Sequence, residues 1–135
     1  MAVELTRRQA LMVLNGLPAI GPISLNRLLE AFGNEPAAVL DASSVALRQV
    51  SKVGPATADT VRGWRLHFRL EREEAKLKAG GAQFVTREDD GYPALLKEIH
   101  DPPLGLYAIG NYVWSDRSVA IVGSRRSTFY GQSVA

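Results

Sequence analysis

A short segment near the end of the chain carries several groups that could bind a phosphate. A glycine lets the backbone approach an anion closely, and serine and threonine hydroxyls donate hydrogen bonds to it. An arginine can hold a phosphate with two parallel hydrogen bonds. These residue types occur together here, so we predict an anion site. Its candidate residues are Gly123, Ser124, Arg125, Arg126, Ser127 and Thr128.

The residues on either side of this segment must position it. Residues 118–122 form an apolar, β-branched run that predicts a buried strand, and we expect a helix after the Gly-Ser-Arg loop that follows it. The N-terminus of that helix would add partial positive charge. Arg125 and Thr128 stand where a Gly-x-Gly-x-x-Gly loop needs glycine, and no Gly-Lys-Ser/Thr ending follows, so dinucleotide and triphosphate sites are disfavoured. A strand-to-helix turn without any ligand is the alternative.

The second half of the chain, from the Gly80-Gly81 pair onward, changes in pattern. It predicts strands at residues 83–86, 104–109 and 118–122, with a helix at residues 94–99 between the first two. Strands that alternate with helices favour an α/β layer with a parallel sheet. Because the chain ends within the helix expected after the third strand, we expect this domain to be incomplete.

The first half predicts a bundle of four or five short helices within residues 1–79. Thr6 can cap a helix that ends near Asn15, and an apolar stripe at residues 25, 28, 29 and 32 predicts a second. Pro36 is suited to the start of a third helix, and Ser44 can cap a fourth. Pro55 opens a longer helix with Trp64 and Phe68 on one side.

A local plan occurs twice in this helical half. An apolar residue, a glycine and a proline precede a helix at residues 20–22 and again at residues 53–55. In helix-hairpin-helix modules such turns direct backbone N–H groups at a DNA phosphate. Those modules have glycine at the first turn position as well, whereas this chain has Ala19 and Lys52. The alternative is a bundle whose glycines only let the chain turn, so Gly21, Lys52 and Gly54 are weak candidates for phosphate binding.

Composition narrows the possible functions. The formal net charge is +2 with no cysteine, so disulfides, thiolate metal sites and a cysteine nucleophile are excluded. His67 and His100 lack companion ligands, so no metal site is predicted. The acidic run at residues 88–90 is expected to be a solvated loop. Neither a secretory signal nor a membrane-spanning stretch is evident, and we expect a cytoplasmic protein. Tyr107, Tyr112, Trp114 and Phe129 could stack on bases, although isolated aromatic residues are more often core.

An ordered series of residues resembles the DNA-processing protein A (DprA/Smf) family. It comprises Tyr92-Pro93, Leu95, Ile99, Asp101-Pro102-Pro103, Leu106, Gly110, residues 120–125 (Ala-Ile-Val-Gly-Ser-Arg), Thr128, Tyr130 and Gly131. The resemblance implies a Rossmann-like domain that binds single-stranded DNA, forms a homodimer and helps load the RecA recombinase in natural transformation. It also implies a DNA-phosphate pocket containing Gly123, Ser124 and Arg125, supported by Thr128, with no enzyme activity and no cofactor.

The expected fold class is therefore α plus α/β. A helical helix-hairpin-helix or SAM-like domain at residues 1–79 would precede the truncated start of a Rossmann-like domain at residues 80–135. Two alternatives to a DNA-binding mediator stay open. One is a nucleotide-processing Rossmann-like hydrolase, and the other is a SAM-like protein-interaction module without DNA binding.

Overall fold

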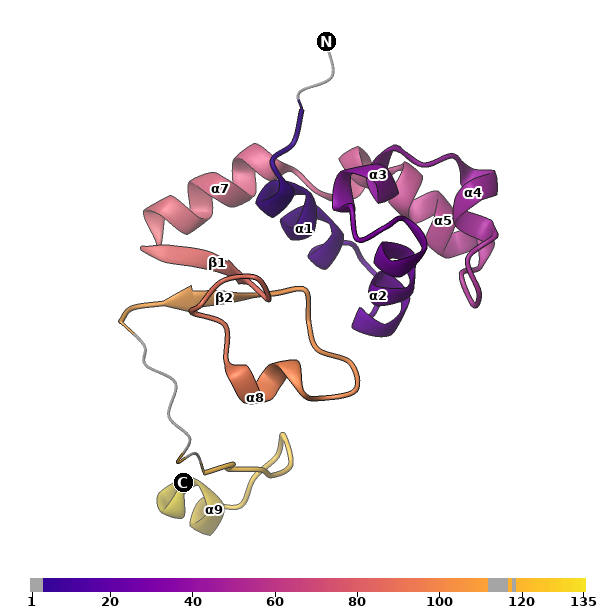
Figure 1. Ribbon diagram of the computed structural model, residues 1–135. Helices are drawn as coiled ribbons and strands as arrows, with labels where there is room; N and C mark the ends of the chain where they lie inside the picture. The colour runs from indigo at the N-terminus through magenta and orange to yellow at the C-terminus, as the bar shows by residue number, and fades with distance from the viewer. Residues whose placement is uncertain (1–3, 112–116, 118) are drawn as a thin grey trace.

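The computed structural model describes residues 4–111, 117 and 119–135. A helical portion comes first, a small sheet follows, and a short helix lies near the C-terminus (Figure 1). The helical portion contains α1 (Arg7–Asn15), α2 (Pro22–Ala31), α3 (Pro36–Asp41), α4 (Ser44–Arg48), α5 (Pro55–Arg62), α6 (Trp64–His67) and α7 (Leu70–Ala79). After it come β1 (Ala82–Thr86), α8 (Ala94–Lys97), β2 (Gly105–Ile109) and α9 (Phe129–Val134).

Helix α1 begins with a reciprocal cap. The side chain of Thr6 accepts a hydrogen bond from the backbone N–H of Gln9 at 3.2 Å, and the Gln9 side chain accepts one from the Thr6 N–H at 2.9 Å. Such a box satisfies two N–H groups that have no partner within the helix. The helix ends at Asn15, so the sequence prediction for both of its ends is confirmed.

The helical portion is more finely divided than predicted. Residues 4–79 form seven helices instead of four or five, because the long helix expected from Pro55 is interrupted. Helix α5 ends at Gly63, and α6 is a single turn before Phe68 takes an extended conformation. The cap of α4 is also corrected from Ser44 to Ser43, whose hydroxyl accepts from the Ala46 N–H at 3.2 Å.

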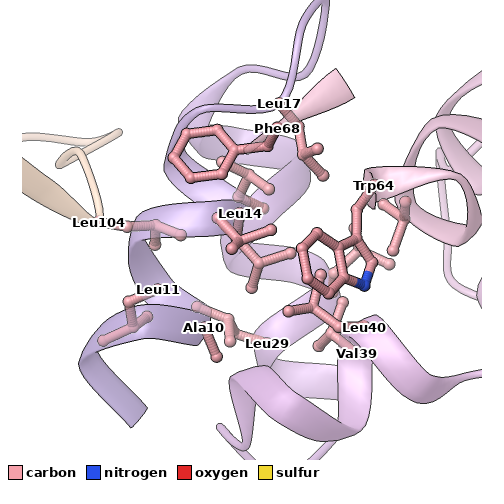
Figure 2. Packing of buried hydrophobic residues seen from close by; sticks show 14 of the residues in the cluster. Ala10, Leu11, Leu14, Leu17, Leu29, Val39, Leu40, Trp64, Phe68 and Leu104 are labelled. Carbon is pink, nitrogen blue, oxygen red and sulfur yellow. The ribbon is translucent and has the colours of Figure 1, made fainter. Parts of the chain in front are cut away.

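The apolar side chains of α1 lie at the centre of one hydrophobic core. Val13 and Leu14 are fully buried there, in a cluster that also contains residues of α2, α3, α4 and α5. Figure 2 shows Leu14 among Leu17, Leu29, Val39 and Trp64. Truncating a buried leucine of this kind to alanine typically costs about 2 to 5 kcal/mol. Phe84 of β1 and Leu104 belong to the same cluster. The core therefore continues across the predicted domain boundary at residues 79 and 80, and the division itself stays a prediction.

Strands β1 and β2 pair antiparallel, which corrects the parallel sheet expected for these two strands. The reason is the connection: residues 87–104 contain only the single turn of α8, and a parallel crossover normally needs a longer helix. Phe84 lies opposite Tyr107, with ring centroids 5.2 Å apart. Gly105 lies beneath Phe84, where an added Cβ would come within 2.2 Å of the phenyl Cζ.

The third predicted strand is absent from the part that the structure describes. Residues 119–122 have no regular structure there, and Val119 and Val122 are each 89% exposed. Ser118 lies outside the described residues. An apolar β-branched run forms a strand only when another strand hydrogen-bonds to it, and none of the described strands does so.

The described structure is thus rich in helix with one small antiparallel sheet, which is compatible with the α plus α/β class. The helix-hairpin-helix or SAM-like assignment and the Rossmann-like start stay predictions. None of the helices within the described ranges is long and apolar enough to cross a membrane.

Candidate functional site

The predicted phosphate-binding segment, residues 123–128, is an open loop that leads into α9. An added Cβ at Gly123 would meet no atom within 4 Å. The hydroxyl of Ser124 donates to the carbonyl of Arg126 at 2.8 Å. Thr128 is the N-cap of α9, where its Oγ1 accepts from the Gly131 N–H at 3.1 Å. The helix expected after the loop is present as α9, and the cap leaves the Thr128 hydroxyl proton free to donate.

Arg125 and Arg126 are exposed, and neither forms an ion pair with a carboxylate of the described residues. Ser127 is exposed beside them. The segment thus presents two positive charges and the hydroxyl groups of Ser127 and Thr128 to solvent within six consecutive residues. Its assignment as a DNA-phosphate site stays a prediction.

The two turns that precede α2 and α5, here called the hairpin turns, have the same backbone conformation although their residues differ. Ala19 has φ 58° and Lys52 has φ 62°, the left-handed conformation that glycine adopts most easily. Gly21 and Gly54 then cap α2 and α5 in extended conformations, each followed by proline at the helix start. The departures from glycine at positions 19 and 52 therefore do not change the turn. They place a strained residue there instead, and at position 52 it carries a positive charge.

Two arginines of α1 bind the acidic run that follows β1. Arg7 donates from Nε to both carboxylate oxygens of Glu88, at 2.9 and 3.0 Å. Arg8 donates from its two terminal nitrogens to the two oxygens of Asp89, at 2.7 Å each. Residues 88–90 form a solvent-exposed turn, as expected, and within it Glu88 and Asp89 are also bound by the two arginines. These pairs lie 81 residues apart in the chain, so no local pattern could have indicated them.

These contacts shift the ionisation of both carboxylates. The hydrogen bonds from Arg8 lower the pKa of Asp89 to about 2, helped by the backbone N–H and hydroxyl of Thr86. The hydrogen bond from Arg7 lowers the pKa of Glu88. Both carboxylates are therefore ionised at neutral pH and balance the two arginines. The charge of Arg7 and Arg8 is accordingly committed to contacts within the protein.

The aromatic and histidine residues named in the sequence analysis differ in their surroundings. Tyr107 packs on Phe84, and burial raises its pKa to about 12, with Glu73 adding to the shift. Phe129 is 87% exposed beside the phosphate-binding segment. Tyr112 and Trp114 lie outside the described residues. His67 and His100 take part in no group of three potential metal ligands among the residues that the structure places.

Comparisons with known proteins point to one protein family. Residues 83–135 match the family model described as DNA recombination-mediator protein A. Protein Smf of Synechocystis sp. is 32% identical over 121 residues, which cover 83% of this chain and 29% of that relative. The chain therefore spans less than a third of the length of the relative. No solved structure shows significant similarity to it.

Proposed function

Because this chain belongs to the DprA/Smf family of DNA recombination mediators, we propose that it is part of a mediator that binds single-stranded DNA through residues 123–128. In this proposal Arg125 and Arg126 contact phosphates, and Ser124, Ser127 and Thr128 add hydrogen bonds. Gly123 lets the backbone approach the strand. Bases contribute little to recognition, because these groups all address the backbone.

The observation that supports the proposal most concerns the positive charges of the two adjacent arginines. Within the described ranges no carboxylate balances Arg125 or Arg126, whereas Arg7 and Arg8 are both paired. A guanidinium without an internal partner can release bound counterions from a nucleic acid and gain affinity by doing so. The proposal therefore assigns the two pairs of arginines different roles, one in DNA binding and one in the fold.

The wider role is proposed from the family. Loading of the RecA recombinase onto incoming DNA in natural transformation, assembly as a homodimer, a cytoplasmic location and the lack of enzyme activity all belong to this proposal. So does a Rossmann-like sheet, in which residues 119–122 would form a strand. Such a sheet would supply the partner strand that the exposed Val119, Ile121 and Val122 lack in the described structure.

The electrostatic part of the proposal is tested by the salt dependence of binding. Fluorescence anisotropy of a labelled thirty-nucleotide oligothymidylate would be measured against protein concentration between 50 and 300 mM salt, a range over which the Debye length shortens by a factor of about 2.4. Each phosphate contact on a single strand contributes about −0.7 to the slope of log affinity against log salt, so two arginine contacts give at least about −1.4. A protein that does not bind would point to the interaction-module alternative, and binding with no salt dependence would contradict the phosphate contacts of Arg125 and Arg126.

A second DNA contact is proposed at the hairpin turns, on the strength of their shared backbone. The left-handed conformation at Ala19 and Lys52, followed by an exposed glycine cap, is the geometry that lets two helices approach a phosphate. Lys52→Gln keeps a long side chain but removes the charge, and it should weaken binding to duplex DNA about twofold to fivefold, as expected for one exposed charge. Equal binding by the variant and the wild type would leave the turns a purely structural role.

A further inference from the structure

A groove of the helical portion lies away from the phosphate-binding segment. It has a volume of about 550 Å³ and runs between the start of α1, the helix α3 and the helix α6. Ligand sites typically enclose roughly 300 to 1,000 Å³, so the groove is large enough to take part of another molecule. Its floor is apolar and includes Leu5, Pro36, Leu40 and Trp64.

Trp64 contributes an unused hydrogen-bond donor to this groove. The residue is 6% exposed and its indole N–H has no hydrogen-bond partner among the described residues. No side-chain donor or acceptor in the described part is both fully buried and unpaired, so the N–H must reach solvent. Figure 2 shows the indole nitrogen on the side of the ring next to Val39 and Leu40 of α3. Since Leu40 and Trp64 both line the groove, we infer that the donor faces it.

The rim of the groove is predominantly acidic. Glu4, Glu35 and Asp41 line it, and both Glu4 and Asp41 are exposed without an ion pair in the described structure. Of the cationic residues on the rim, Arg7 lies 3.4 Å from Glu35 and is also held by Glu88. The other, Arg65, stacks on the Trp64 ring with 4.3 Å between its Cζ and the ring centroid. The free carboxylates repel phosphate and attract a cationic partner.

We propose that this groove binds a basic, partly apolar peptide segment of a partner protein. A backbone carbonyl of the peptide would accept the hydrogen bond of the Trp64 indole N–H. Lysine or arginine side chains would pair with Glu4 and Asp41, and an apolar side chain would pack on Leu5 and Leu40. A polar anchor beside an apolar floor is the usual composition of a specific binding site. This site is separate from residues 123–128 and does not depend on DNA binding.

The experiment first selects peptides that bind the protein and then tests whether they bind in the groove. A displayed library of random twelve-residue peptides would be selected on the wild-type protein and screened against the double variant Glu4→Gln/Asp41→Asn. Asp59→Asn, an exposed carboxylate of α5 that does not line the groove, is the matched control. A selected peptide would be titrated into protein labelled with ¹⁵N, in a Trp114→Phe background, while the Trp64 indole N–H resonance is followed.

We expect peptides with at least a pair of basic residues, a shift of the Trp64 indole resonance on binding, and at least fivefold weaker affinity for the double variant. The Asp59→Asn protein should bind as the wild type does. The proposal is overturned if the selected peptides are acidic, if no peptide distinguishes the double variant, or if the indole resonance does not move. It is also overturned if oligothymidylate shifts that resonance and binds the double variant more tightly, because the groove would then be a nucleic-acid site.

Discussion

Arg8 binds Asp89 through a pair of parallel hydrogen bonds, each 2.7 Å long, and so ties the first helix to the segment after β1. The same guanidinium donates to the carbonyl of Phe84 at 2.9 Å. Asp89 also accepts from the backbone N–H of Thr86 at 2.7 Å. A single carboxylate thus holds both the turn after β1 and the attachment of the sheet to α1.

Replacing Asp89 by asparagine should therefore lower the free energy of unfolding by about 1 to 3 kcal/mol, the range for lost charge-assisted hydrogen bonds at a partly exposed site. The measurement is urea denaturation followed by circular dichroism. Asp90→Asn is the matched control, since its side chain is exposed and forms no ion pair in the described structure. Equal stability of the Asp89 and Asp90 variants would contradict the structural role of the pair.

The same contact predicts how stability depends on pH. Arg8 and Thr86 lower the pKa of Asp89 to about 2 from an ordinary value of 3.8. A depressed carboxylate pKa stabilises the fold above the unfolded pKa and loses that contribution as the pH falls through the folded pKa. The stability difference between the wild type and Asp89→Asn should therefore be constant above about pH 5 and shrink between pH 4 and pH 2. A difference that persists unchanged at pH 2 would show that the charge of Asp89 plays no part.

Gly105 should tolerate no side chain. An alanine Cβ would come within 2.2 Å of the phenyl Cζ of Phe84, which is 3% exposed and part of the core. Gly105→Ala should lower the free energy of unfolding by about 1 to 3 kcal/mol, as overpacking usually does. Gly123→Ala is the comparison, because its Cβ meets nothing within 4 Å. The prediction fails if thermal denaturation gives the two variants the same midpoint.

The hairpin turn at Lys52 predicts a gain in stability. Lysine is strained at φ 62°, and glycine adopts this conformation freely, so Lys52→Gly should raise the free energy of unfolding by up to about 1 kcal/mol. Gln49→Gly, at φ −74° and ψ −16°, should lower it by about 0.5 to 1 kcal/mol. Guanidinium denaturation of both variants checks the opposite signs, and destabilisation by Lys52→Gly would show that the side chain matters more than the strain.

Local sequence signals predicted the local structure well. The Thr6 cap, the proline starts of α3 and α5, and the apolar faces all depend on residues within a few positions of one another. The sheet was predicted less well, since the pairing of β1 with β2 depends on how residues 87–104 return. Apolar alternation indicates a strand but does not specify its partner or its direction.

For the candidate site, too, the sequence indicates the local features but not the long-range contacts. A cluster of donors at residues 123–128 is visible in the sequence because glycine, serine and arginine stand side by side. The binding of Arg7 and Arg8 to residues 88 and 89 is not visible, since any of several acidic residues could serve as partner. The groove at Trp64 was missed for a related reason. The apolar spacing of Trp64 indicates a buried residue, but the groove beside it depends on where α1, α3 and α6 lie in the fold.

The central claim is that the unpaired guanidinium groups of residues 125 and 126 bind the backbone of single-stranded DNA. The most direct measurement compares the affinity of oligothymidylate for the wild type, Arg125→Ala and Arg48→Ala at one moderate salt concentration. Arg48 is equally exposed but lies on α4. We predict that Arg125→Ala weakens binding by about 1 to 3 kcal/mol while Arg48→Ala leaves it unchanged. Unchanged binding by Arg125→Ala, or an equal loss in both variants, would contradict the claim.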